Sequence, residues 1–347
     1  MKRVVIISLL AVMIAFQGFA QTDLQPAAIV NLTKSEPITV KQLRTDCERV
    51  EKSSGRALTQ QQRRDVLDAL INERLVLQAA ERDRITISEN EVTQQVNQMK
   101  SQMVQVLGRQ PTDAEFASAI KNETGLDMQP FRDQLRKQLI TQKYLMTKKQ
   151  SSFENIKVPT DAEIANEYNL RRTQLVRPDT VRFSMIQVAY GENAAAKSKA
   201  KELADKLYKE IGSSASKFDE VVLRGQSPSS GYQAGDGGYL PRNAEAAQIV
   251  GPEFINVAFN LRQGEVSKMM EGQIGYQIIK ITETYAMKNL ELDDVYQPGS
   301  RATVRDYIGN FLLQQRQQDV LVKATQELVS ELRANKTFQI FEKNLTW

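Results

Sequence analysis

The spacing of apolar residues predicts that the first half of the chain is helical. Between residues 40 and 149, apolar residues recur every three or four positions, the spacing that gives a helix one buried face. Helix starts are marked by the S/T-x-x-E/Q pattern of a capping box, in which two side chains satisfy backbone N–H groups. The pairs that precede predicted helices are Thr59/Gln62, Ser88/Glu91, Thr112/Glu115 and Thr160/Glu163. This pattern indicates a domain built from packed helices.

Short segments near both ends of the chain have the pattern of strands. Residues 27–33 and 36–40 are rich in β-branched residues and predict two strands joined by a polar turn. Residues 303–335 predict one long helix, and residues 337–341 alternate like a strand. A single terminal strand needs a sheet edge to pair with, and the N-terminal strands offer one. We therefore expect the C-terminal segment to fold back onto the N-terminal helical domain.

Between residues 180 and 285 the pattern changes to a mixture of strands and helices. Strands are predicted at 181–190 and 274–284, helices at 194–212, 218–222 and 252–261, and a Gly/Ser-rich loop at 225–240. A segment of about 100 residues is a common size for one domain. The predicted fold class is α+β. A mostly helical lobe is completed by the C-terminal helix, and an α/β domain is inserted between its two parts.

The first twenty residues have the composition of a secretory signal peptide. Lys2 and Arg3 precede an apolar run, Val4 to Phe16, that is too short to span a bilayer, and small residues follow it. Cleavage is predicted after Ala20, and a retained membrane anchor is the alternative. No cysteine follows this site, so a lipid anchor has no acceptor there. The sequence predicts an exported protein that spans no membrane after cleavage.

Composition excludes several kinds of chemistry. The chain of 347 residues has no histidine, which rules out Ser-His-Asp triads and histidine-ligated metal sites. The formal charge of +4 falls to +2 without Lys2 and Arg3, and so balanced a charge argues against a nucleic-acid partner. Cys47 is the one cysteine and cannot form an internal disulfide. We interpret it as a packed thiol, with pairing between chains as the alternative.

Two stretches of the sequence carry a family resemblance. The run LINERLVLQAAERDRITISENEV, residues 70–92, is similar to the N-terminal lobe of the SurA/PrsA-type periplasmic chaperones. The run FINVAFNLRQGEVSKMMEGQIGYQIIKITE, residues 254–283, resembles the second half of their parvulin-type (rotamase, PpiC-like) peptidyl-prolyl isomerase domain. The resemblance implies four parts: a signal peptide (1–20), a helical chaperone domain (21–178), a parvulin-like domain (179–286), and a C-terminal helix and strand packed on the N-terminal lobe (287–347).

The resemblance also implies where an isomerase site would lie. Parvulins place a histidine on the first strand, a cysteine or aspartate in the loop before a G-G-D-L-G motif, and a second histidine on the last strand. The matching positions here hold Met185, Ser227 and Gln277. Serine and glutamine still form hydrogen bonds, but they do not ionise near neutral pH. No position in this set is therefore a confident catalytic residue.

The proline-ring pocket of the family is matched by other positions of this sequence. They are Phe254, Ile249 and Val250. Gly237 stands where the family motif has a leucine, and we expect this change to remove one apolar wall. An isomerase lowers the rotation barrier of ~18–20 kcal/mol by binding the twisted amide best, which requires no metal or cofactor. With these substitutions we expect weak or absent isomerase activity.

The predicted function is that of a periplasmic chaperone that binds unfolded exported or outer-membrane proteins. Its partners are extended polypeptides, and no cofactor is expected. Gln277 is interpreted as a structural replacement in a site that has lost its catalytic groups. An active isomerase acting on Xaa-Pro bonds of exported proteins is one alternative. The other is a non-enzymatic subunit of an envelope assembly.

Overall fold

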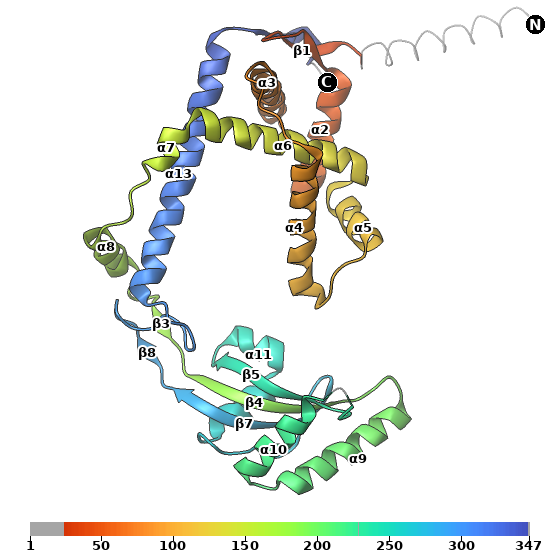
Figure 1. Cartoon of the computed structure of the whole chain (residues 1–347), viewed down its shortest axis with the longest axis vertical. Coiled ribbons are helices and arrows are strands. Elements are labelled where there is room, and N and C mark those ends of the chain that lie inside the picture. Colours follow the sequence, from red (N-terminus) through yellow and green to blue (C-terminus); the bar gives the residue numbers. More distant parts are fainter. Residues whose placement is uncertain (1–23, 228, 346–347) are drawn as a thin grey trace, which may run out of the picture. The chain divides into compact units, whose positions relative to one another are not determined.

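The computed structural model describes residues 24–227 and 229–345, which form two compact units. The first unit contains the described residues up to Ile156 together with those from Arg316 onwards, and the second contains the described residues of Lys157–Gln315. Figure 1 colours the chain from the N-terminus to the C-terminus. The predicted signal peptide and its cleavage point lie outside the described residues.

Unit 1 is mostly helical. Its elements are β1 (Pro26–Val30), β2 (Glu36–Thr39), α2 (Val40–Ser54), α3 (Gln60–Arg82), α4 (Glu89–Leu107), α5 (Asp113–Thr124), α6 (Met128–Lys148), α7 (Gln150–Glu154), the C-terminal part of α13 (Val304–Ala334), β9 (Phe338–Ile340) and the 3-10 turn Glu342–Asn344. One core joins α2, α3, α6, α13 and the small sheet, with Leu67, Ile71 and Leu75 of α3 fully buried at its centre. A second cluster joins α4, α5 and α6.

The four capping boxes predicted from the sequence are all present. In each, the Ser or Thr side chain accepts from the backbone three residues on, and the Glu or Gln side chain accepts from the cap residue's own N–H. These boxes start α3, α4, α5 and α8, so the boundaries of these helices follow from local chemistry.

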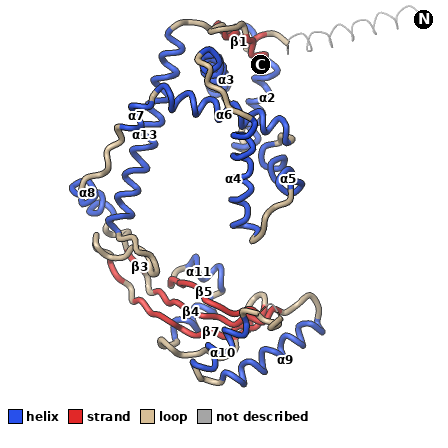
Figure 2. The backbone as a smooth tube through the Cα atoms, viewed as in Figure 1, coloured by secondary structure: helices blue, strands red, loops and turns tan. Residues whose placement is uncertain are grey.

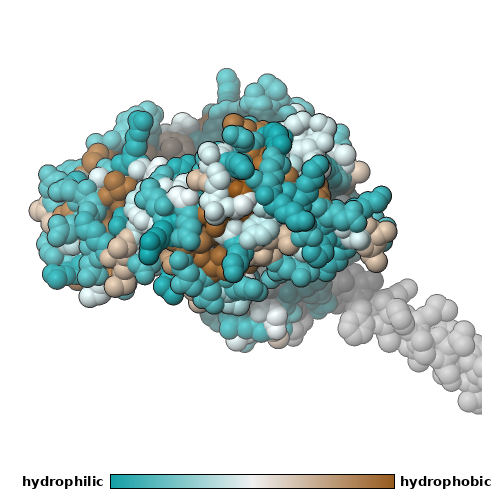
Figure 3. All heavy atoms as spheres, turned by 90° about the horizontal axis from the view of Figure 1, so that it is seen from below, coloured by the Kyte–Doolittle hydropathy of each residue, from teal (hydrophilic) through white to brown (hydrophobic). Residues whose placement is uncertain are grey.

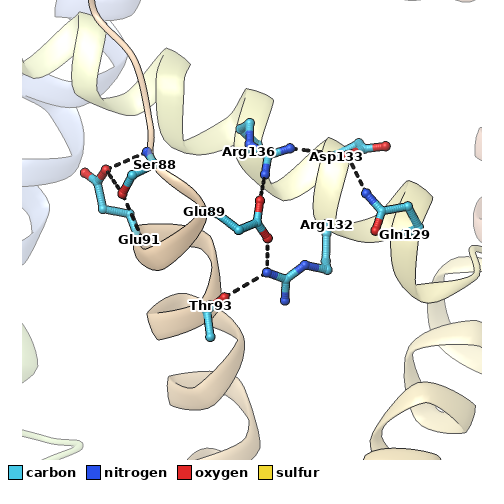
Figure 4. Close-up of polar contacts among 8 residues, drawn as sticks. All are labelled: Ser88, Glu89, Glu91, Thr93, Gln129, Arg132, Asp133 and Arg136. Atoms are coloured by element: carbon cyan, nitrogen blue, oxygen red, sulfur yellow. Dashed lines mark hydrogen bonds and ion pairs between the residues drawn. The ribbon is translucent and has the colours of Figure 1, made fainter.

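A charge cluster ties the first turn of α4 to α6. Glu89 receives hydrogen bonds from Arg132 and Arg136, which lie one turn apart on α6 (Figure 4). Arg132 also donates to the Thr93 hydroxyl at 2.8 Å. Hydrogen bonding by Arg132 holds the pKa of Glu89 below its usual range. A carboxylate at a helix N-terminus is also favoured by the helix dipole.

The C-terminal strand pairs with the N-terminal sheet, as predicted. In the sheet of order β2-β1-β9, β9 runs antiparallel to β1 with Ile29 opposite Gln339. Figure 2 shows β1 as a strand beside the marked C-terminal end of the chain. Arg333 at the end of α13 donates to Asn72 and Asp68 of α3, each at 2.6 Å. The two ends of the sequence therefore build one lobe together.

Unit 2 contains a four-stranded antiparallel sheet with helices on both faces. Its elements are α8 (Asp161–Arg171), β3 (Val176–Arg177), β4 (Thr180–Ala189), α9 (Ala194–Ile211), α10 (Ala215–Gly225), β5 (Gln233–Pro241), α11 (Ala244–Val250), α12 (Pro252–Asn260), β6 (Met270–Glu271), β7 (Gly275–Tyr285), β8 (Lys288–Asn289) and the start of α13. The strand order is β5-β4-β7-β6, and β3 pairs separately with β8. Figure 1 shows α11 on one side of this sheet and α9 on the other.

Two points differ from the sequence-based expectations. Residues 233–241 form a strand, β5, where we predicted a loop, because the glycines are used for a bulge in the ladder with β4. The start of α13 also lies in unit 2, where Val304 and Ile308 are buried against Ile164 of α8. The compact units therefore divide at other points than the expected boundaries 178 and 286, and that four-part division remains a prediction.

Polar residues cover most of one face of the molecule. Figure 3 shows one face, on which hydrophilic residues dominate and hydrophobic residues lie in small groups. Among the described residues, no helix is both long enough and apolar enough to cross a membrane.

Candidate functional site

The α11–α12 face of the unit 2 sheet carries an aromatic pair. Phe183 of β4 and Phe254 of α12 meet edge to face, with ring centroids 5.3 Å apart and an interplanar angle of 68°. Both are nearly buried, at 5% and 6% exposure, within a cluster that includes Ile279 and Ile281 of β7. Phe254, predicted as a proline-pocket residue, is therefore a buried core residue of this face and offers little open surface.

The ring of Phe183 occupies the space above Gly237. A Cβ placed on Gly237 would lie 2.2 Å from Cε2 of Phe183, far closer than real contacts allow. Gly237 is the extra residue of the β5 bulge, because Phe183 pairs with Gly238 and Ser184 with Asp236. The wall that we expected to be lost at Gly237 is thus replaced by an aromatic ring from the neighbouring strand.

An open cavity of about 410 Å³ lies between the end of β5 and α11, and we name it the candidate pocket. Its apolar lining comes from Phe183, Ala246, Ile249 and Val250, beside the bare backbone of Gly237. Ile249 is 73% exposed although it is a large apolar residue. The structure brings both Ile249 and Val250 to the pocket, whereas Phe254 is buried in the adjoining cluster with Val250 and does not line the pocket.

Met185 and Gln277 lie on the face of the sheet that carries Phe183. Met185 is half-buried against the cluster of Phe183 and Phe254, opposite Ile279 of β7. Gln277 is two residues from Ile279, so both side chains point to the same face. The Gln277 amide lies against Gly272, where a Cβ would come within 2.7 Å of its Oε1. Neither residue supplies a group that titrates near neutral pH.

Ser227, unlike the other two matched positions, does not lie on a strand of the sheet. It follows α10 in an exposed turn, where its hydroxyl is 3.0 Å from that of Ser229. Its carbonyl accepts from the N–H of Ser230 at 3.0 Å. Among the described residues, no hydrogen bond joins any two of Met185, Ser227 and Gln277. The assignment of these three positions to one site remains a prediction.

A charged network braces the strands beside the pocket. Arg182 of β4 donates to Asp236 of β5 at 2.7 Å and to Glu283 of β7 at 2.8 Å. The hydrogen bond from Arg182 holds the pKa of Asp236 below its usual range, and the Gly238 N–H adds to this effect. Hydrogen bonding to Glu283 raises the pKa of Tyr285 to about 12. Arg182, Asp236 and Glu283 are therefore charged at neutral pH, while the Tyr285 phenol is neutral, and the contacts of Arg182 tie β4 to both neighbouring strands.

Phe183 is the pocket residue that sequence reasoning missed. A large residue at 183 and a glycine at 237 are compatible with a ring that fills the space of a missing side chain. The sequence does not reveal this relationship, because it depends on the pairing of β4 with β5. Tyr239, which also lines the pocket, lies in the segment that we predicted as a loop. Within the described residues, no group of three or more His, Cys, Asp or Glu side chains is placed to hold a metal ion.

Two family models match the chain in consecutive regions. A SurA-like N-terminal domain matches residues 2–145, and a PPIC-type PPIase domain matches residues 159–297. The foldase protein PrsA of Clostridium botulinum (strain Loch Maree / Type A3) is 25% identical over 305 residues, which cover 86% of this chain and 79% of that protein. The chain belongs to the SurA/PrsA-type parvulin chaperones.

The chain is also similar to other proteins of the SurA/PrsA type. The chaperone SurA of Saccharophagus degradans is 25% identical over 230 residues, covering 64% of this chain and 48% of that protein. A solved SurA-like chaperone of Campylobacter jejuni, from the study of PEB4 and Cj1289, covers 91% of this chain and 99% of its own, with 15% identity and a TM-score of 0.39. PrsA of Bacillus subtilis covers 90% of this chain and 93% of its own, with 23% identity and a TM-score of 0.28.

The two family models establish which kinds of domain the chain contains and in which order. The chain is α+β, with a SurA-like helical lobe and a PPIC-type domain in one polypeptide. The C-terminal helix and β9 complete the helical lobe. A chaperone or foldase of this type acts on polypeptides.

Proposed function

We propose that this protein is an exported, periplasmic chaperone that captures unfolded polypeptides, and that its PPIC-type domain binds proline-containing segments without turning them over efficiently. The observation that carries the proposal is the candidate pocket. It keeps an apolar surface for a proline ring, while the two positions on the same sheet face that match the family's histidines are Met185 and Gln277.

The pocket supplies binding but little differential stabilisation of a twisted amide. Catalysis requires contacts that are stronger in the transition state than in the ground state. Phe183, Val250 and Ala246 contact an apolar ring equally in both states, because their contacts are non-directional. Arg182 forms ion pairs with Asp236 and Glu283, so its charge is already neutralised by the neighbouring strands and does not stabilise a twisted amide.

The exposure of Ile249 provides the sharpest test of the pocket. Ile249→Asp places a charge on the apolar rim without disturbing the core, since the side chain is 73% exposed. Gln248→Asp is the matched control, because Gln248 is its exposed neighbour on α11 and does not line the pocket. The measurements are binding of a dye-labelled proline peptide by anisotropy and suppression of aggregation of an unfolded outer-membrane protein.

We expect Ile249→Asp to weaken peptide binding by about tenfold or more, and Gln248→Asp to leave it unchanged. The unchanged chain should slow aggregation at a near-equimolar ratio without any nucleotide. The proposal is wrong if the unchanged chain neither binds the peptide nor slows aggregation. If both variants bind the peptide equally well, the candidate pocket is not where the proline segment binds.

A further inference from the structure

A second cavity of about 410 Å³ lies in unit 2, where the β3–β8 pair meets the end of β5. Leu175, Leu290 and Tyr296 form apolar walls. Leu175 and Leu290 are 6% and 3% exposed, and the Leu290 N–H donates to the Leu175 carbonyl at 2.8 Å. Tyr296 is stacked on Tyr307, with ring centroids 4.0 Å apart. These walls belong to a packed core and are fixed before any ligand arrives.

The second cavity and the candidate pocket share part of their lining. Tyr239, Pro241 and Asn243 line both. Tyr239 contributes to the lining of both spaces, and the loop at Gly299 lies against its ring, because a Cβ on Gly299 would be 2.4 Å from Cε2 of Tyr239. The two cavities therefore follow one another along the end of β5.

The strand between the cavities is suited to an extended polypeptide. β5 is an edge strand of its sheet, so one side of its backbone is not used by β4. Peptides that lie along such an edge obtain affinity from main-chain hydrogen bonds and specificity from pockets for alternate side chains. Arg177 and Gln297 line the second cavity and offer donors to peptide carbonyl groups.

We propose that the second cavity binds an aromatic or large aliphatic side chain of the same extended polypeptide whose proline occupies the candidate pocket. This inference rests on the proposed function, because it extends that site to a second subsite. The client class is thereby narrowed to segments that carry a proline and a large apolar residue a few positions apart, since an extended chain advances ~3.3 Å per residue and the two cavities share lining residues.

The test compares dye-labelled peptides with and without the apolar residue. One peptide has a single proline in an alanine–serine background, and a matched series adds phenylalanine on either side at increasing spacing. Gln297→Trp fills the second cavity from an exposed position, and Gln248→Trp is the control on α11 outside both cavities. Thermal unfolding of both variants establishes that each is folded.

For the unchanged chain, we expect the best-spaced phenylalanine peptide to bind about tenfold tighter than the proline-only peptide. Gln297→Trp should remove this gain and leave proline-only binding within about twofold. A gain that survives Gln297→Trp overturns the inference while the proposed function stands. If neither peptide binds, the inference is wrong, and if the unchanged chain also fails to slow aggregation, the proposed function is wrong as well.

A labelled cysteine gives an independent readout. Cys47 is 2% exposed, so it should not react with an environment-sensitive thiol dye. Gln297 is exposed, so Gln297→Cys introduces the one thiol that the dye can reach. We expect the dye signal to saturate with the phenylalanine peptide and to remain flat with the proline-only peptide. A labelled Gln248→Cys chain should respond to neither. A response at 248 that matches the one at 297 would contradict the assigned subsite.

Discussion

The ring of Phe183 and the missing side chain of Gly237 are complementary. Phe183 of β4 fills the volume that a side chain at 237 would need, with Cε2 2.2 Å from the Cβ position. The ring also meets Phe254 edge to face. A wall of the candidate pocket is thereby contributed by a different strand from the one that the family resemblance implies. The pocket remains apolar even though the motif around Gly237 has changed.

This relationship predicts non-additive stability changes. Gly237→Ala should cost about 1–3 kcal/mol of unfolding free energy because the Phe183 ring must move. Phe183→Ala should cost about 3–5 kcal/mol as a cavity forms. In the double variant the new methyl group occupies space left by the Phe183 ring. The loss of unfolding free energy in the double variant should therefore be smaller than the sum of the two single losses by more than about 0.5 kcal/mol. Calorimetry of the full chain measures all three.

Gly235→Ala is the matched control for this cycle. It lies on the same strand, and a Cβ there meets nothing within 4 Å. We expect the variant to unfold within about 0.5 kcal/mol of the unchanged chain. Additive costs for Phe183→Ala and Gly237→Ala would show that the two residues do not share the space.

The capping box at the start of α4 predicts a pH-dependent contribution to stability. Hydrogen bonds from the Ser88 backbone and side chain, and then from Lys143, lower the pKa of Glu91 from 4.5 to about 2. Because the folded-state pKa is depressed, the contribution is complete above pH 4.5 and is lost as the pH falls towards 2. Gln at this position keeps the capping pattern without the charge.

Glu91→Gln therefore separates the charge from the cap. The melting temperature of the unchanged chain should exceed that of Glu91→Gln at pH 7, and the difference should shrink between pH 4.5 and 2. Differential scanning fluorimetry of both proteins between pH 7 and pH 2 measures this difference in melting temperature. A difference that stays constant with pH would mean that the charge of Glu91 does not stabilise the helix start.

Arg333 is expected to hold the C-terminal strand on the N-terminal lobe. Its guanidinium donates to Asp68 and Asn72 and lies 5.0 Å from the centroid of the Phe338 ring. Arg333→Ala should make local opening of residues 335–345 easier by about 1–3 kcal/mol. Arg333→Lys should open as easily as Arg333→Ala, because an ammonium lacks the planar fork of donors that contacts both Asp68 and Asn72.

Hydrogen exchange at the β1–β9 ladder measures this opening. Lys323→Ala, an exposed position on the same helix, is the control and should leave the exchange rates unchanged. Unchanged protection of residues 338–340 in Arg333→Ala would show that the strand pairing alone holds the C-terminal segment.

The local elements were predictable from sequence, and the pocket was only partly so. The start of α4 follows from Ser88 and Glu91, and the start of α3 from Thr59 and Gln62, because capping is a short-range interaction. The pairing of β9 with β1 was predictable because a single terminal strand requires an edge.

The missed features depend on long-range register. β5 was predicted as a loop because Gly235, Gly237 and Gly238 lower its strand propensity, and the bulge that uses them exists only beside β4. The filling of the space at Gly237 by Phe183 likewise requires two strands to be aligned. The division of α13 between two cores also cannot be deduced from its own periodicity.

Restoring the family's residues tests the assignment of Met185 and Gln277. Both lie on the sheet face that carries Phe183, although neither lines the candidate pocket, so the double change Met185→His and Gln277→His places two imidazoles on that face. We expect the double variant to show isomerisation above that of the unchanged chain, and neither single variant to do so. An assay with a short proline peptide measures this change, and no increase in the double variant would contradict the assignment.

The most direct test of the central claim combines two measurements on residues 21–347. One follows the cis-to-trans isomerisation of a short proline peptide, and the other follows the aggregation of an unfolded outer-membrane protein. We predict suppressed aggregation together with isomerisation no faster than the uncatalysed rate. Clear isomerisation that is lost in Phe254→Ala would contradict the account, because Met185, Ser227 and Gln277 would then form part of a working catalytic site.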